Sequence, residues 1–266
     1  MGYLEKSRTY KGFYYGDLSQ GGLDYLHRRT LEMADEVVGL FHKNGIRYSI
    51  CGGTLLGAET TGKFIPWDDD FDMCVLDDDY EKARRLLLEH GITDAIVQCR
   101  ETEPKYYHGW IKIRDTKSST GPDKDGYANT GVWVDMYKLY RIKKSAVDWF
   151  VCKEHIIYLW RRFRFSDFGI GEFLKRFFRA NLLYKAIKSL IPLIVSSSDV
   201  YIIGSASKVT VADSDVWPLR CYTLEGRRYN GFGNADGYLR NHYGDNYRVL
   251  PPEELRRVGI NEIRFK

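Results

Sequence analysis

The stretch from Tyr48 to Tyr80 reads YSICGGTLLGAETTGKFIPWDDDFDMCVLDDDY and joins an apolar strand, a double-glycine turn and an acidic segment that leads into a second strand. Because successive side chains of a strand point to opposite faces, Asp70 and Asp72 share one face and Phe71 lies on the other. Two carboxylates roughly 5 to 7 Å apart repel each other unless a cation lies between them. The stretch therefore predicts a site for one or two Mg²⁺ ions, or for Mn²⁺, although a solvated acidic turn would look similar.

The glycines upstream point to an anion next to this metal site. Gly52 and Gly53 allow the backbone to approach a ligand closely, and Thr54 is predicted to N-cap a short helix that begins at Leu55. The free amides at a helix N-terminus bind phosphate readily. Alone, the glycines would also suit a strand-to-helix turn that needs a positive φ. Together with the acidic strand, they predict phosphate donors and metal carboxylates in one small volume.

These two motifs carry a resemblance to a known family. Residues 52–58 (GGTLLGA) and 64–72 (FIPWDDDFD) resemble the signature of LicD-type phosphotransferases, which are relatives of fukutin in the nucleotidyltransferase-fold superfamily. The resemblance implies an α/β (α+β) fold with a nucleotidyltransferase-type mixed sheet flanked by helices. Family members usually carry a basic residue near position 60, which this chain lacks, so either Lys63 holds the donor phosphate instead or the donor is different.

Two later strands supply further candidate site residues. Over residues 107–115, alternation places Trp110, Lys112 and Arg114 on one face, where the two cations would offset the charge of a phosphoryl donor or simply be solvated. In the apolar strand 131–137, Asp135 needs a partner. The resemblance implies that Asp135 is the third metal ligand or the general base, and it favours the functional reading of Lys112 and Arg114.

Apolar periodicity predicts further helices over 22–44 and 77–89, and strands over 95–100 and 200–203. A short helix that ends at Gly244 carries Tyr238 and Tyr243. This segment resembles the closing motif of the family, which implies that the two tyrosines stack on the donor base.

Residues 141–188 differ in composition from the rest of the chain. They contain twelve Lys or Arg against four Asp or Glu, interleaved with aromatic side chains. We expect a helical insertion at about 141–195 within a single domain spanning 1–266, and the resemblance does not extend over this insertion. Such a segment suits an anionic membrane surface or a polyanionic acceptor, and equally a packed insertion with solvated charges. No nucleic-acid-binding motif accompanies the charge, so no nucleic acid partner is expected.

Several features predict a cytoplasmic protein. The five cysteines form no C-x-x-C pair, the first residues contain no apolar signal-peptide core, and no apolar run is long enough to span a bilayer. The only membrane contact we expect is peripheral, on the inner face.

The resemblance implies metal-dependent transfer of a phosphoryl-alcohol group, such as phosphocholine, from a CDP-linked donor to a hydroxyl of a cell-surface glycan or its lipid-linked precursor, with release of CMP. One alternative is a nucleotidyltransferase that releases pyrophosphate by means of the same carboxylates. A glycosyltransferase with an Asp-x-Asp motif would leave the glycine turn unexplained. A non-catalytic adaptor that binds membrane or glycan through the basic segment is the alternative outside the enzymes.

Overall fold

The computed structural model describes residues 13–14, 20–120, 126–165, 169–179, 198–204, 208–258, 260 and 263–265. The strands are β1 (Phe13–Tyr14), β2 (Tyr48–Ile50), β3 (Phe71–Leu76), β4 (Ala95–Gln98), β5 (Ile111–Asp115), β6 (Ser118–Ser119), β7 (Trp133–Lys143), β8 (Asp199–Ile203), β9 (Thr210–Ala212), β10 (Arg220–Leu224), β11 (Arg227–Gly231), β12 (Arg257–Val258) and β13 (Arg264–Phe265). The helices are α2 (Gln20–Lys43), α3 (Gly52–Thr60), α4 (Asp77–His90), α5 (Val147–Phe165), α6 (Ile170–Arg179), α8 (Asp213–Val216) and α9 (Ala235–Tyr243), with 3₁₀ turns η2 (Lys144–Ala146) and η4 (Glu253–Leu255).

One large mixed sheet organises the described part of the chain. Its hydrogen-bonded order is β10-β11-β2-β3-β7-β5-β4, with β8 beside β7 and β9 beside β8. The pairs β3–β7 and β11–β2 are parallel, whereas the other pairs in this sheet are antiparallel. β1 pairs with β12 and β13 with β6 in two small separate ladders. The mixed sheet flanked by helices confirms the predicted fold class.

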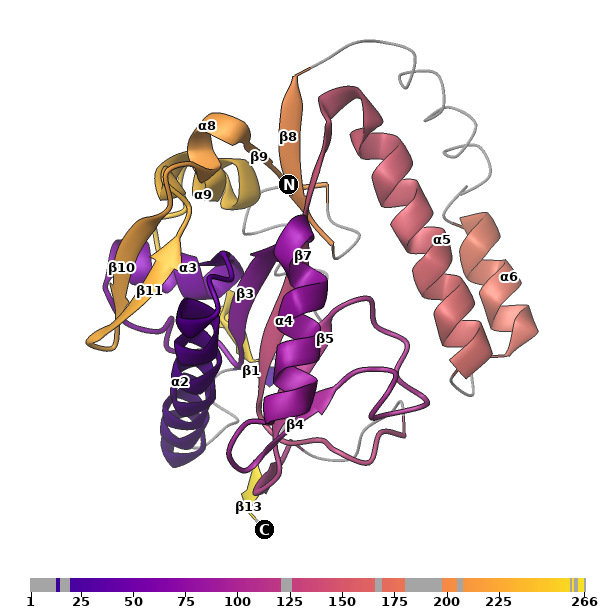
Figure 1. The fold of residues 1–266 in the computed structure, drawn as a ribbon, viewed down its shortest axis with the longest axis horizontal. Helices are drawn as coiled ribbons and strands as arrows, with labels where there is room; N and C mark the ends of the chain where they lie inside the picture. The colour runs from indigo at the N-terminus through magenta and orange to yellow at the C-terminus, as the bar shows by residue number, and fades with distance from the viewer. Residues whose placement is uncertain are drawn as a thin grey trace.

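The long strand β7 occupies the centre of this sheet. One edge of β7 pairs with β3 along Val134–Leu139. Its beginning also pairs with β5, and its end pairs with β8. Figure 1 shows β7 passing from the centre of the sheet up to β8. Residues of β3 and β5 are therefore held in fixed register on either side of β7.

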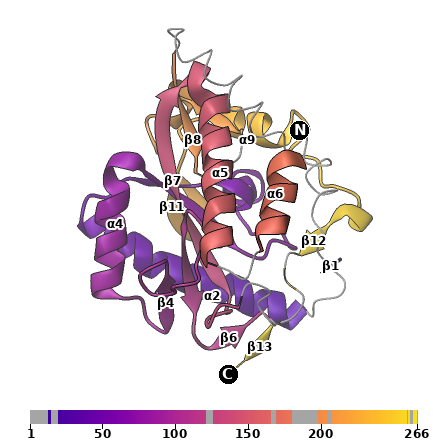
Figure 2. The ribbon, with the colours of Figure 1, turned by 90° about the vertical axis from the view of Figure 1, so that its right-hand side faces the viewer.

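Helices α2 and α4 pack against the central strands, because each presents an apolar stripe. In α2, the side chains expected to face the core are buried, among them Leu23, Leu26, Met33, Val37 and Phe41 at 0% exposure. Figure 1 shows α2 and α4 together, with α5 and α6 standing apart from them. The view in Figure 2 places α5 and α6 side by side, and residues of both form a small apolar cluster.

The start of α3 and the end of β7 differ from the predictions made from the sequence. The helix after β2 begins at Gly52 with Cys51 as its N-cap, so the prediction that Thr54 caps a helix from Leu55 was wrong. Within the predicted insertion, β7 continues to Lys143 before the helical part begins. Residues 166–168 and 180–197 of that segment lie outside the described residues. Among the described residues, no helix is long and apolar enough to cross a membrane.

Candidate active site

Three neighbouring strands bring the predicted acidic residues together. In the parallel register of β3 and β7, Asp72 lies opposite Asp135, and in the antiparallel register of β5 and β7, Lys112 lies opposite Asp135. Asp70 immediately precedes β3. One carboxylate oxygen from each of Asp70, Asp72 and Asp135 lies within 4.8 Å of the other two. The structure therefore assembles these three carboxylates into one cluster, as alternation implied for Asp70 and Asp72 and the resemblance implied for Asp135.

The carboxylate of Asp135 is held by three donors. Trp110 Nε1 donates to it at 2.7 Å and Trp133 Nε1 at 2.9 Å. Lys112 Nζ lies 2.8 Å from the same carboxylate, and Asp135 is only 3% exposed. A carboxylate has about four acceptor positions, so these donors fix its orientation and leave little room for a further proton donor. Asp135 is therefore built as a rigid anion.

The carboxylates of Asp70 and Asp72 are in a different environment, with less compensation for their charge. Burial, followed by the charge of Asp135, raises the pKa of Asp72 to about 8. Burial and the neighbouring carboxylates, Asp72 first, raise the pKa of Asp70 well above its ordinary value. Among the described residues, Asp72 Oδ1 is buried without a hydrogen-bond partner, as is Asp68 Oδ2.

Unpaired buried carboxylate oxygens in a cluster of acids are the donor set of a divalent cation. Asp68 and Asp69 form a second group of close carboxylates with Asp70. The residues present therefore fit Mg²⁺ or Mn²⁺ held by Asp70, Asp72 and Asp135.

The two glycines make room for acidic side chains. A Cβ on Gly52, whose φ is +56°, would lie 3.2 Å from Asp72 Cγ and closer still to Asp72 Oδ2. A Cβ on Gly53 would lie 3.0 Å from Asp68 Cγ and would overlap Asp68 Oδ2. The sequence predicted that a phosphate would lie close to these glycines. In the structure, the carboxylates of Asp72 and Asp68 lie close to them. In the first turn of α3, the amides of Gly53 and Thr54 still lack intrahelical acceptors.

Thr54 and Tyr238 lock the glycine turn to its neighbours. Thr54 Oγ1 accepts a hydrogen bond of 2.8 Å from the backbone amide of Asp72. Tyr238 Oη accepts one of 3.0 Å from the amide of Gly52, and its ring is fully buried. Tyr238 therefore has no open ring face, so the prediction that it stacks on a donor base was wrong. Its burial follows from packing under α3, which the apolar pattern of a short helix did not reveal.

The remaining predicted residues lie at different distances from the carboxylate cluster. Arg114 Nε donates to Gln98 Oε1 and its Nη1 to Gly131 O, both at 2.8 Å, so these bonds direct the buried guanidinium away from the acids. Lys63 lies exposed after α3, and its contact with Gly57 is made through its backbone carbonyl. Tyr243 ends α9, where its ring lies 4.2 Å from the ring of His242. The ligand roles of these three residues stay predictions.

Sequence reasoning gave no role in the site to Trp110, Trp133 or Asp68. Alternation already placed Trp110 on the face of Lys112, and Trp133 lies two positions before Asp135, so the same rule could have assigned both indoles to the cluster. Asp68 belongs to the acidic run at residues 68–72. Its side chain lies beside Gly53 because of the path of the loop before β3. His27 Nε2 lies 2.8 Å from Asp68 O and helps to fix that loop.

Comparison with known proteins finds a family domain that includes this site. Residues 45–165 match the LicD/FKTN/FKRP nucleotidyltransferase domain. The chain is 26% identical over 244 residues to the lipopolysaccharide cholinephosphotransferase LicD of Haemophilus influenzae, covering 84% of this chain and 90% of that protein. It is 41% identical over 59 residues to the ribitol 5-phosphate transferases FKRP of Mus musculus and Homo sapiens, which is 22% of this chain and 12% of each of those proteins.

The matched range contains Gly52, Asp70, Asp72, Lys112 and Asp135. It also continues through α5, so the prediction that the resemblance does not extend over the insertion was wrong for residues 141–165. The expected resemblance is confirmed: residues 45–165 of this chain match the nucleotidyltransferase domain of the LicD family.

Proposed function

We propose that this chain is a phosphotransferase that moves a phosphoryl-alcohol group, phosphocholine or a similar unit, from a CDP-linked donor to a hydroxyl of a cell-surface glycan or its lipid-linked precursor. In this reaction the acceptor oxygen bonds to the phosphorus that carries the alcohol, the bridging P–O bond breaks, and CMP leaves. The observation that carries the proposal is the cluster of Asp70, Asp72 and Asp135 on adjacent strands. The relatives named for choline phosphate and ribitol 5-phosphate transfer support the class of reaction.

Asp70, Asp72 and Asp135 would hold one or two Mg²⁺ ions, which when bound neutralise donor phosphate and stabilise charge in the transition state. Within this cluster the residues have different tasks. Asp135, fixed by two indoles and Lys112, suits the role of a rigid ligand. Oδ1 of Asp72, which has no hydrogen-bond partner among the described residues, is open to the cation, and the acceptor hydroxyl would lose its proton to a carboxylate oxygen of Asp70 or Asp72 that the cation leaves free.

The donor phosphates would lie against the N-terminus of α3. The amides of Gly53 and Thr54 point out of its first turn, where an anion is favoured by the helix dipole. Lys112 adds a buried cation on the same sheet face as Asp135. The amides and the ammonium group would orient the donor, while the buried setting keeps competing water away from the phosphorus.

The test is CMP release from a panel of CDP-alcohols, with and without Mg²⁺, measured for the wild type and Asp72→Asn. We expect Mg²⁺-dependent CMP from one donor and a loss on the order of 10³-fold in the variant. Asp78→Asn is the matched control, because the Asp78 side chain is 87% exposed at the start of α4. Asp78→Asn should release CMP at the wild-type rate. Equal rates for Asp72→Asn and wild type would refute the assignment.

The same assay separates the alternatives. Pyrophosphate release from nucleoside triphosphates, with no CMP from any CDP-alcohol, would favour the nucleotidyltransferase. A non-catalytic adaptor would release neither product, and its binding of vesicles or polysaccharide would be unchanged by Asp72→Asn.

We also propose that α6 rests on an anionic membrane surface. Its Phe173 and Phe177 pack against α5, whereas Ile170, Leu174 and Phe178 are 55%, 44% and 65% exposed. These three residues recur every four positions and form one apolar stripe, with basic side chains on the rest of the helix. An exposed apolar stripe on a basic helix is typical of helices that lie in the membrane interface.

Flotation with vesicles measures this contact. Phe178→Glu should abolish binding to vesicles that contain phosphatidylglycerol, and neutral phosphatidylcholine vesicles should bind little wild type. Val249→Glu is the control, because Val249 is 70% exposed outside the α5–α6 segment. Equal flotation of Phe178→Glu and wild type would refute the contact.

A further inference from the structure

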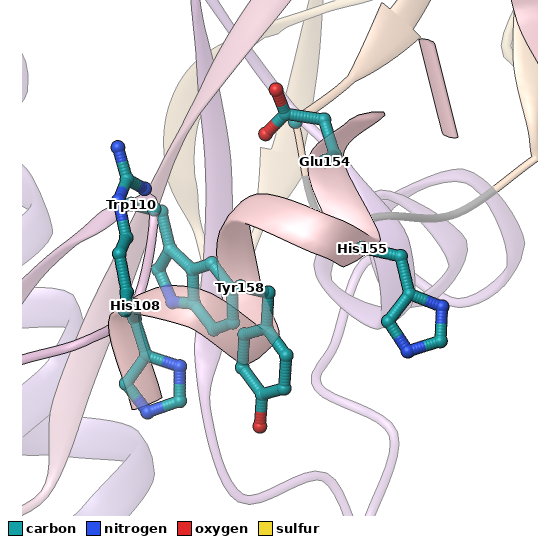
Figure 3. Close-up of a pocket in the computed structure, with 8 residues that line it drawn as sticks. His108, Trp110, Glu154, His155 and Tyr158 are labelled. Carbon is teal, nitrogen blue, oxygen red and sulfur yellow. The ribbon is translucent and has the colours of Figure 1, made fainter. Parts of the chain in front are cut away.

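A cavity of about 320 Å³ opens beside the carboxylate cluster, between α5 and the segment that leads into β5. Its walls include the rings of His108, Trp110 and Tyr158, together with Glu154 and Arg161. Figure 3 shows the three rings gathered on one side, while Glu154 and His155 project from the preceding turn of α5. The cavity has the size of a small-ligand site, and the mechanism above does not use it.

The cavity shares one wall with the carboxylate cluster. That wall is Trp110, whose ring lines the cavity and whose Nε1 donates to Asp135 Oδ1 at 2.7 Å. Trp110 and Lys112 alternate onto the same face of the chain entering β5, and Lys112 also pairs with Asp135. A molecule packed against the Trp110 ring would therefore lie one side chain away from the carboxylates.

The polar groups in the cavity suit a ligand with many hydroxyl groups. Glu154, Tyr158 and Arg161 are spaced i, i+4 and i+7, so they lie on one face of α5. The carboxylate of Glu154 accepts hydrogen bonds and the guanidinium of Arg161 donates them, whereas a hydroxyl group does both. A sugar ring offers hydroxyl groups at its edge and an apolar C–H face that can pack on Trp110 or Tyr158.

The charges disfavour a quaternary ammonium group, which aromatic pockets otherwise bind well. Arg161 lines the cavity, and Glu154 lies 3.4 Å from Lys153. After burial, which is the larger cause, the charges of Lys112, Arg114 and Arg162 lower the pKa of His108 to about 3. The cation Arg161 in the wall, and Lys153 beside Glu154, therefore suit a sugar with hydroxyl groups better than a choline head group.

A second cavity of about 430 Å³ shares His108, Trp110 and Arg161 with the first. Tyr106 lines this second cavity, and its hydroxyl is buried with no partner among the described residues. A buried hydroxyl without a partner is costly, and a ligand hydroxyl could satisfy it. The two cavities together would hold more than one sugar residue.

We propose that the cavity between Trp110 and α5 is the subsite for the acceptor glycan, with the second cavity holding the neighbouring sugar residue. The proposal rests on the proposed function, since it places the acceptor of that reaction. The sugar next to the reacting hydroxyl would stack on Trp110 or Tyr158, and its hydroxyl groups would bond to Glu154 and Arg161.

Saturation-transfer NMR tests the subsite without relying on turnover. The probe is a core oligosaccharide freed of lipid from a lipopolysaccharide, mixed with the full-length chain. We expect saturation of sugar ring protons with the wild type and a loss of at least fivefold with Tyr158→Ala. Glu154→Gln, which keeps the side-chain shape, should weaken the signal several-fold. Trp149→Ala is the control, because Trp149 begins α5 outside the cavity walls and packs under Lys153.

Two results would overturn the subsite. They are an unchanged signal in both folded variants, or no signal with the wild type. Failure of the proposed function is distinguishable, because CMP release without acceptor depends on Asp72, whereas the saturation-transfer signal reports only the binding of sugar. If wild type binds the oligosaccharide through Tyr158 but releases no CMP from any donor, the proposed reaction fails and the glycan subsite stands.

Discussion

Gly52→Ala offers a direct test of how the glycine turn positions the metal ligands. Gly52 has a φ of +56°, which costs an L-residue about 1–2 kcal/mol. The new methyl would also lie 3.2 Å from Asp72 Cγ and overlap Asp72 Oδ2, so the carboxylate must move by roughly 1 Å. A displacement of that size at reacting groups can cost about 100-fold in rate. We therefore expect a folded protein, destabilised by about 1–2 kcal/mol, with about 100-fold slower CMP release and weaker Mn²⁺ binding.

Gly39→Ala is the matched control for this experiment. Gly39 lies inside α2, and a Cβ there would meet nothing within 4 Å. Alanine in a helix interior should stabilise the protein by about 0.5–1 kcal/mol and leave metal binding unchanged. Unfolding by urea gives the stability change, and Mn²⁺ binding followed by electron paramagnetic resonance reports on the site. If Gly52→Ala bound Mn²⁺ and released CMP like the wild type, the carboxylate position would not depend on the glycine.

Three further predictions concern the same cluster. Metal affinity should rise with pH up to about 8 and then level off, because binding needs the ionised form of Asp72, whose pKa burial raises to about 8; Mn²⁺ titrations from pH 6.5 to 8.5 measure this, and a flat profile would contradict it. Trp133→Phe removes one of the three donors to Asp135 and should slow kcat by about 10- to 100-fold with little change in the free energy of unfolding; steady-state kinetics beside urea unfolding would show the reverse if Trp133 only fills space. Tyr238→Phe leaves the Gly52 amide without its acceptor and should destabilise the fold by about 1–3 kcal/mol, measured by thermal unfolding, and an unchanged midpoint would refute that bond.

Strand alternation predicted correctly that Asp70 and Asp72 share one face, because it is a local rule. These two residues needed only the period of two along the chain into β3. The register of β3 on β7 then set Asp135 opposite Asp72, which no local pattern can specify because it depends on pairing across 63 positions. The resemblance to a family supplied Asp135 before the register was known.

Residues whose surroundings come from distant segments were harder to assign. Tyr238 looked like a ligand contact because it sits in a motif-like helix, yet its hydroxyl bonds to Gly52 from 186 positions away. The space above the Cα of Gly53 looked open to a ligand because no local signal showed that the Asp68 carboxylate would lie there. Arg114 shares a strand face with Lys112, but Gln98 on the adjacent strand β4 captures its guanidinium. In each case the neighbouring group lies on a distant segment of the chain, and the local sequence pattern does not show that the two will meet.

The cluster also implies a conflict between stability and metal binding. Without a cation, the folded state holds Asp72 with its pKa raised to about 8, far above its ordinary value, because of burial and the charge of Asp135. A carboxyl whose pKa is raised on folding binds more protons in the folded state, so stability falls as pH rises from about 4 to 8. Asparagine at position 72 carries no charge and removes this loss.

Asp72→Asn should therefore unfold at a higher temperature than the wild type in EDTA at pH 8, and at nearly the same temperature at pH 4. Adding Mg²⁺ should raise the unfolding temperature of the wild type at pH 8, because a ligand present at 100 times its Kd stabilises the folded state by about 2.7 kcal/mol. The variant has lost a ligand and should gain little. Differential scanning calorimetry measures the unfolding temperatures of both proteins under these conditions. A wild type more stable than Asp72→Asn in EDTA at pH 8 would show that the carboxylates are compensated within the protein, and the argument for a bound cation would lose its electrostatic basis.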